Sequence, residues 1–82
     1  MKQKTFIIKK RLGFPAREAA IFVDISRTSK SEVWVEKNGE RADGKSVVGL
    51  LTLAISYGSS ITITVEGEDE DAVMEKISDL ME

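Results

Sequence analysis

The clearest pattern in the chain is a strict alternation of apolar and polar residues from position 60 to position 66. Successive side chains of a β-strand point to opposite faces of a sheet, so this alternation predicts a strand with one apolar face. Gly67 ends the pattern. The residues expected to face a core are Ile61, Ile63 and Val65.

Three further segments have the pattern of strands. Residues 2 to 9 are rich in β-forming residues, and residues 31 to 36 place two valines on one face and Trp34 on the other. The pair Asn38-Gly39 is a signal for a tight hairpin turn, so residues 41 to 43 are expected to return as a short strand. The sequence therefore predicts four strands, two of which form a hairpin with a charged, exposed tip.

Two of the remaining segments predict ordinary amphipathic helices. Pro15 follows a break at Leu12-Gly13-Phe14 and predicts a helix that starts there or one residue later and runs to Arg27 or Thr28. The acidic run from Glu68 to Asp71 favours the start of a last helix, because negative charge is stabilised at that end. The expected core-facing residues are Ala19, Phe22, Val23 and Ile25 in the first helix, and Ala72, Val73, Ile77, Leu80 and Met81 in the last.

The middle helix is predicted to begin at Ser46, whose hydroxyl can accept a hydrogen bond from an amide of the first turn. The apolar residues that follow are spread too widely around the helix for one buried stripe. We expect Leu50 and Leu53 to face the core and the others to remain exposed beside Ser46 as a docking patch. The residues expected in this patch are Val47, Val48 and Leu51.

The predicted elements follow the order β-α-β-β-α-β-α. Eighty-two residues are enough for one core, so we assign residues 1–82 to a single α+β domain. Four strands in this order can form an antiparallel sheet, and three helices can cover one face of it. The predicted fold is therefore an open-faced β-sandwich.

One motif suggests a different function. Residues Gly39 to Ser46 match G-x-x-x-x-G-K-[ST], the phosphate-binding loop of nucleotide-binding proteins. That loop needs a buried parallel strand before it and a long helix after it, whereas Asn38-Gly39 indicates a hairpin. We interpret the match as a coincidence, and nucleotide binding stays an alternative that a titration with ATP would test.

The chain contains no histidine and no cysteine. The usual zinc sites, histidine-assisted serine chemistry and thiol nucleophiles are thereby excluded or made improbable, so we expect no metal, no cofactor and no enzymatic activity. We find no signal peptide and no apolar run of membrane-spanning length. We therefore take the cytoplasm as the default expectation for its location.

The net charge of -2 is unevenly distributed. Residues 1 to 17 contain six Lys or Arg and no acid, whereas residues 66 to 82 contain eight acids and one base. A basic end can bind nucleic acid, but the overall acidity and the small number of aromatic residues favour two solvated faces of opposite sign. We therefore expect neither nucleic acid nor a membrane among the partners.

The order of elements and several separate motifs resemble HPr, the phosphocarrier of the bacterial sugar phosphotransferase system. The likeness covers essentially the whole chain and implies the same open-faced β-sandwich. The motifs that carry it are Leu12-Gly13-Phe14-Pro15-Ala16-Arg17, Trp34-Val35-Glu36-Lys37-Asn38-Gly39, Gly44-Lys45-Ser46-Val47-Val48-Gly49-Leu50-Leu51 and Gly67-Glu68-Asp69-Glu70.

The resemblance fails at the phosphocarrier position. The family motif Gly-Leu-His-Ala-Arg-Pro stands here as Gly13-Phe14-Pro15-Ala16-Arg17-Glu18, so Pro15 replaces the histidine that accepts the phosphoryl group. Pro15, Ala16 and Arg17 therefore form a degenerate phosphocarrier site. Glu18 adds a negative charge where a phosphate would meet Arg17 and a helix start. We expect no histidine phosphotransfer.

The resemblance leaves a regulatory site. In many Gram-positive relatives the serine matching Ser46 is phosphorylated by an ATP-dependent HPr kinase/phosphorylase, and the product is a corepressor of a catabolite-control transcription factor. The catabolite-repression HPr-like proteins lack the histidine and keep this serine. The likeness implies the same role here, with that transcription factor or a metabolic enzyme as target. The residues expected to bind partners are Arg17, Ala20, Lys45, Val47, Val48 and Leu51.

Plainer alternatives stay open. Ser46 is a simple helix cap worth about 1 kcal/mol in one of them. In another, the protein occupies HPr-binding surfaces as an unmodified decoy. Arg17 is either a solvated side chain or a phosphate-facing one, and the second role depends on the starts of the first two helices being neighbours.

Overall fold

The computed structural model describes residues 1–11 and 13–82. Its elements follow the predicted order and form an antiparallel sheet with helices on one face, so the predicted open-faced β-sandwich is confirmed. Leu12, part of the predicted break after the first strand, lies outside the described residues. The elements are β1 (Lys2–Ile7), α1 (Ala16–Arg27), β2 (Ser31–Lys37), β3 (Glu40–Asp43), α2 (Val47–Thr52), β4 (Ser60–Gly67) and α3 (Glu70–Met81).

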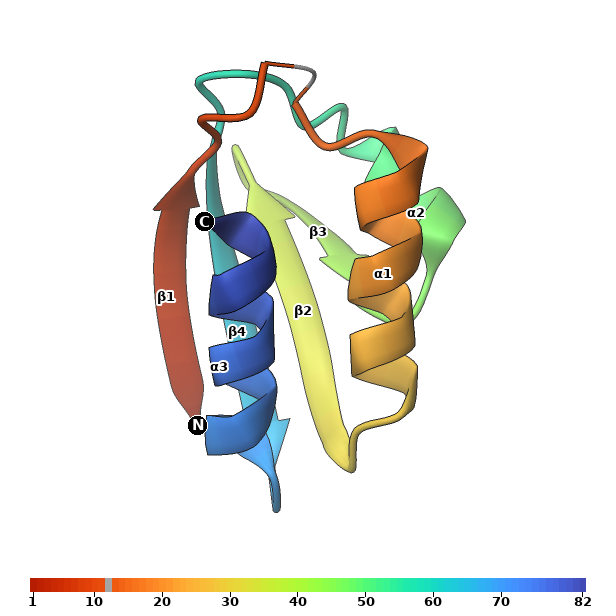
Figure 1. The fold of residues 1–82 in the computed structure, drawn as a ribbon, viewed down its shortest axis with the longest axis vertical. Coiled ribbons are helices and arrows are strands. Elements are labelled where there is room, and N and C mark those ends of the chain that lie inside the picture. The colour runs from red at the N-terminus through yellow and green to blue at the C-terminus, as the bar shows by residue number, and fades with distance from the viewer. Residues whose placement is uncertain (12) are drawn as a thin grey trace.

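The sheet has the strand order β1-β4-β2-β3, and all of its pairings are antiparallel. Figure 1 shows α1 and α3 side by side across one face of the sheet, with α2 near β3. In the β2–β4 pairing Val33 lies opposite Val65 and Val35 lies opposite Ile63. The apolar residues predicted from the alternating pattern therefore form one continuous surface beneath the helices.

The hydrophobic core lies between this surface and the helices. Ile61, Ile63 and Val65 are at most 1% exposed, which confirms the pattern from which β4 was predicted. The other buried apolar residues come from the remaining strands, the helices and the loops at one end of the sheet. They are Phe6, Ile8, Phe14, Ala19, Phe22, Val23, Val33, Val35, Ala42, Leu50, Leu53, Ile55, Val73, Met74 and Ile77.

The hairpin between β2 and β3 has the predicted turn. Asn38 and Gly39 have φ values of 50° and 82°, and Lys37 pairs with Glu40 across the turn. Positive φ at both central residues matches the right-handed twist of the flanking strands. Gly39 is therefore a turn residue, and the short antiparallel strand β3 begins after it at Glu40.

Two details of the sequence prediction were wrong. The first strand ends at Ile7 and not at residue 9. In α3, Ala72 is exposed and Met74 is buried, because Val73, Met74 and Ile77 form the face toward the sheet and Ala72 lies outside it.

Among the helices of the described residues, none is long and apolar enough to cross a membrane.

Candidate functional site

Ser46 is the N-cap of α2, as predicted. Its backbone is extended, with φ of -122° and ψ of 112°, and its Oγ accepts a 3.0 Å hydrogen bond from the amide of Gly49. The Ser46 carbonyl accepts the next bond, 3.1 Å from the amide of Leu50. The residue is half-buried. The hydroxyl therefore stabilises the start of the helix from a position at the protein surface.

The apolar patch beside Ser46 is smaller than predicted. Val48 is 72% exposed and Leu51 is 45% exposed, and their spacing of three positions makes them neighbours on the helix surface. Leu50 and Leu53 are buried, as expected. Val47 is half-buried and packs against the core, so its contribution to an exposed patch is reduced.

The segment from Gly39 to Ser46 does not have the geometry of a phosphate-binding loop. A phosphate cradle needs free backbone amides. Here the amide of Gly44 donates to the carbonyl of Val33 at 2.8 Å, and that of Lys45 donates to Oδ1 of Asp43 at 2.9 Å. The amide of Ser46 donates to the carbonyl of Asp43 at 3.1 Å. Since these amides already have partners, the structure gives no support to nucleotide binding.

Pro15 stands immediately before α1, as predicted. Its φ of -67° and ψ of 167° are extended, and its carbonyl accepts a 3.0 Å bond from the amide of Ala19. Ala16, Arg17 and Ala20 are exposed on α1. The pyrrolidine ring has no atom that accepts a phosphoryl group, so this helix start has lost the nucleophile of the phosphocarrier motif.

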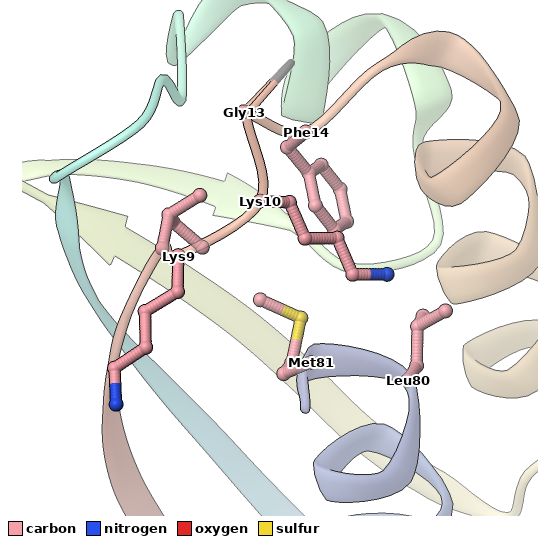
Figure 2. A pocket seen from close by; sticks show the side chains of 7 residues that line it. Lys9, Lys10, Gly13, Phe14, Leu80 and Met81 are labelled. Carbon is pink, nitrogen blue, oxygen red and sulfur yellow. The ribbon is translucent and has the colours of Figure 1, made fainter.

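The side chains next to Pro15 are partly paired with each other. Oε1 of Glu18 lies 3.8 Å from Nζ of Lys10, which partly balances the negative charge that the sequence placed at this helix start. Lys10 also borders a small pocket, where the Lys10 side chain runs beside the ring of Phe14 and the Lys9 side chain points away (Figure 2). The pocket is lined by Ile8, Lys9, Lys10, Gly13, Phe14, Leu80 and Met81.

The starts of the first two helices are not neighbours, so the condition for a phosphate-facing Arg17 near Ser46 is not met. Nε of Arg27, in the last turn of α1, donates a 3.1 Å hydrogen bond to the carbonyl of Lys45, so α2 begins beside the end of α1. Figure 1 shows α1 and α2 running in opposite directions. Arg17 lies ten residues earlier on α1, about 15 Å away along the helix axis.

The sheet register explains this arrangement. α1 ends shortly before β2 begins, and β3 runs back antiparallel to β2 until Asp43 lies opposite Trp34. The next residue, Gly44, bonds to Val33 near the start of β2. The chain therefore enters α2 at the end of the sheet where α1 finishes. Arg27 could not be identified from the sequence as a neighbour of Ser46, because no local pattern links the two residues.

Within residues 1–11 and 13–82, no group of three or more acidic side chains is arranged to hold a metal ion. The charged groups near Ser46 are Arg27, Lys45 and Asp43. This site can present a hydroxyl and an apolar surface to a partner, and Oδ1 of Asp43 beside it accepts a hydrogen bond from the Lys45 amide. The arrangement fits a binding surface.

Comparison with known proteins identifies the same family that the sequence motifs resemble. A family model described as "PTS HPr component phosphorylation site" matches residues 2–82. The chain is 42% identical over 77 residues to the HPr-like protein Crh of Halalkalibacterium halodurans, which covers 94% of this chain and 92% of the relative. It is 37% identical over 78 residues to the HPr-like protein Crh of Bacillus subtilis, covering 95% and 92%.

The fold comparison agrees with the sequence comparison. The crystal structure of HPr-C-His from Thermoanaerobacter tengcongensis superposes with a TM-score of 0.93 at 36% identity, covering 99% of this chain and 91% of that chain. The relatives named HPr are described as phosphocarrier proteins, and those named Crh are described as HPr-like proteins. The chain belongs to the HPr family of the bacterial phosphotransferase system.

Proposed function

We propose that this protein is a non-catalytic, HPr-like regulator that is phosphorylated on Ser46 by an HPr kinase/phosphorylase. In the phosphorylated form it acts as a corepressor or effector in carbon catabolite regulation. Its target is a catabolite-control transcription factor or a metabolic enzyme, and it works in the cytoplasm. A related solved protein, the Crh of Bacillus subtilis, is a catabolite repression HPr, which supports this assignment.

The observation that carries the proposal is the position of Ser46 beside exposed apolar residues. The hydroxyl caps a surface helix, and Val48 and Leu51 project from the same helix with 72% and 45% exposure. Exposed apolar groups next to a modifiable hydroxyl favour a protein partner. A phosphorylated serine in this position would place charge and apolar contact within one small interface.

The degenerate site supports a regulatory role. Pro15 occupies the helix start where the family motif has its histidine, and the chain contains no histidine at all. Carriage of a phosphoryl group on a histidine is therefore replaced, in our proposal, by modification of a serine. The exposed Arg17 and Ala20 remain available to the partner as surface residues.

Phosphorylation at Ser46 is compatible with the fold. The Oγ atom accepts a hydrogen bond from the amide of Gly49, and phosphate oxygens can accept in its place. The carboxylate of Asp43 lies nearby and opposes the new charge, whereas Arg27 and Lys45 favour it. A partner is expected to supply its own Arg or Lys to the phosphate and an apolar side chain to Val48 and Leu51.

The direct test is phosphorylation with ATP and a purified HPr kinase, followed by intact-mass measurement and localisation of the phosphate by tandem mass spectrometry. We expect one phosphate on Ser46 and none on Ser46→Ala. The matched control is Ser56→Ala, since Ser56 is an exposed serine outside the helix start. Phosphate recovered on Ser26, Ser29 or Ser56 would contradict the proposal.

The functional test is calorimetry against one catabolite-control regulator. We expect the phosphorylated protein to bind more tightly than the unmodified one. Ser46→Asp should be a poor mimic, because one carboxylate has less charge and fewer acceptor oxygens than a phosphate. Equal affinity of the two forms would instead support the unmodified decoy.

A further inference from the structure

We propose that Arg27 is the intramolecular partner of the phosphate on Ser46 and that this pair fixes the end of α1 to the start of α2. The inference rests on the proposed function, since it concerns the phosphorylated state. It assigns to Arg27 a role that the degenerate phosphocarrier motif would have suggested for Arg17.

The position of the Arg27 guanidinium is set by an existing contact. Nε donates a 3.1 Å hydrogen bond to the carbonyl of Lys45, the residue that precedes Ser46. The carbonyl oxygen of Lys45 is two bonds from the backbone nitrogen of Ser46, and the Ser46 Cα follows that nitrogen. Adding this short span to the 3.1 Å hydrogen bond places Nε within about 6 Å of the Ser46 Cα. The side chain is therefore held beside the modified residue before any phosphate is added.

The guanidinium keeps donors for a phosphate. Arg has five N–H donors in a planar fork, and the bond to Lys45 uses one of them. Among the described residues, no carboxylate lies within ion-pair distance of Arg27. Its charge is thus not neutralised by the protein, and its remaining donors can form charge-assisted hydrogen bonds to phosphate oxygens.

Other charged groups near Ser46 come from three segments. Lys45 precedes the serine and adds positive charge, while Asp43 at the end of β3 adds negative charge and accepts from the Lys45 amide. Asp24 lies one turn before Arg27 on α1 and is exposed. The first turn of α2 has no acidic side chain. Arg27 and Lys45 therefore stand against two carboxylates, Asp43 and Asp24, of which Asp43 already accepts a hydrogen bond from the Lys45 amide.

The contact between Arg27 and the phosphate should have two measurable effects. A nearby cation favours the dianion of phosphoserine over the monoanion, so Arg27 lowers the second phosphate pKa from its usual value of about 6. The new contact also joins two elements that are distant in sequence. Phosphorylation should therefore stabilise the folded state more when Arg27 is present than when it is absent.

The experiment uses full-length protein with phosphoserine incorporated at position 46 during synthesis, so that no kinase is needed. The second phosphate pKa is measured by ³¹P NMR titration in the parent protein, Arg27→Gln, Arg27→Lys and Arg17→Gln. Arg17→Gln is the matched control, because it removes the same charge from an exposed position on the same helix. Thermal unfolding of each phosphorylated and unphosphorylated pair gives the stability change.

We expect Arg27→Gln to raise the second phosphate pKa by about 0.3 to 0.5 units at low salt, as a partly screened charge contact predicts. Arg27→Lys should recover part of this shift, and Arg17→Gln should leave the pKa within about 0.1 units. The melting temperature gained on phosphorylation should fall by about 2 to 4 °C in Arg27→Gln.

An unchanged phosphate pKa in Arg27→Gln, or an equal change in Arg17→Gln, would overturn this inference. Circular dichroism of the unphosphorylated variants separates a loss of fold from a loss of the ion pair. A kinase that ignores Ser46 would overturn the proposed function but would leave these measurements unaffected. The two proposals therefore fail in distinguishable ways.

Discussion

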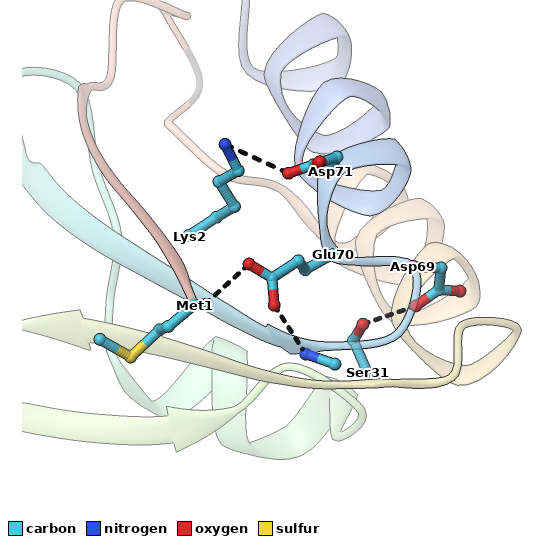
Figure 3. Close-up of polar contacts among 7 residues, drawn as sticks. Met1, Lys2, Ser31, Asp69, Glu70 and Asp71 are labelled. Carbon is cyan, nitrogen blue, oxygen red and sulfur yellow. Dashed lines mark hydrogen bonds and ion pairs between the residues drawn. The ribbon is translucent and has the colours of Figure 1, made fainter.

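The hydroxyl of Ser31 donates a 2.5 Å hydrogen bond to Oδ1 of Asp69, and this contact joins the start of β2 to the residue before α3 (Figure 3). The amide of Lys30 donates to Oδ2 of the same carboxylate at 2.9 Å. Because both bonds favour the charged form, they hold the pKa of Asp69 below its usual value of 3.8. Ionisation of Asp69 therefore stabilises the folded state.

Acid should therefore destabilise the protein through Asp69. A carboxylate with a lowered folded-state pKa stabilises the fold above its ordinary value of 3.8, and this stability is lost as the pH falls below that value. Asp69→Asn should be less stable near neutral pH and should show a smaller loss of stability on acidification. Urea unfolding between about pH 2 and pH 7 measures both effects.

The control for this prediction is Asp79→Asn, which removes an exposed carboxylate near the other end of α3. Part of the acid sensitivity should survive in Asp69→Asn, because the Met1 amino group and the Gly67 amide also lower the pKa of Glu70. A pH profile of Asp69→Asn identical to that of the parent would contradict the role assigned to the Ser31 contact.

Replacing Ala54 with glycine should stabilise the protein. Ala54 follows α2 with a φ of 52°, a left-handed conformation in which a Cβ atom is costly. Its carbonyl also accepts a 2.7 Å bond from Nζ of Lys37, which helps to hold this conformation. After allowance for the greater entropy of unfolded glycine, we expect a gain of about 0.5–1 kcal/mol.

Chemical denaturation measures this gain. The matched control is Ala72→Gly, an exposed position inside α3, where the same substitution should cost about 1 kcal/mol. Stability changes of opposite sign in Ala54→Gly and Ala72→Gly would show that the effect comes from the backbone conformation at each position. A loss of stability in Ala54→Gly would show that the strain at this helix end is smaller than the entropy cost.

Phosphoenolpyruvate and the general enzyme of the phosphotransferase system should not label the protein, because Pro15 has no acceptor atom. Pro15→His should regain part of the activity. Adding Glu18→Gln should raise the labelling rate a further two- to fivefold or so, since a charge at a helix end is worth about 0.3–1 kcal/mol. Radiolabel incorporation measures each rate.

The pairing of Glu18 with Lys10 limits the expected gain. Acid-labile phosphate on the unsubstituted protein would contradict the assignment of Pro15 as a lost acceptor. If Pro15→His alone were as active as a family phosphocarrier, Glu18 would have no inhibitory effect.

Val48→Glu should weaken binding to a catabolite-control regulator about tenfold or more without preventing phosphorylation of Ser46. Val48 is 72% exposed, so the stability of the free protein should change by less than about 0.5 kcal/mol. Calorimetry with the phosphorylated protein measures binding, and circular dichroism measures the fold.

Ile7→Glu is the matched control for Val48→Glu. Ile7 is 52% exposed, and it faces away from the helices because the preceding Phe6 on β1 is buried. The Ile7→Glu variant should therefore leave regulator binding unchanged. Equal loss of affinity in both variants would mean that the patch formed by Val48 and Leu51 is not the contact surface.

The sequence by itself determined the elements and most of the core. A period of two identified Ile61, Ile63 and Val65, and a helical period identified Ala19, Phe22 and Val23, because both patterns depend only on local backbone geometry. The caps at Pro15 and Ser46 were equally local. Such features need no knowledge of which segments meet in space.

The tertiary structure decided which charged groups surround the two candidate sites. The contact of Arg27 with Lys45 and the pairing of Lys10 with Glu18 join different elements or a loop and a helix. The first depends on the register of β2 and β3, which brings the chain back to the end of α1. Local periodicity contains no information about that register. A position of Arg17 near Ser46 therefore stayed conditional on neighbouring helix starts, and the fold places Arg27 there instead.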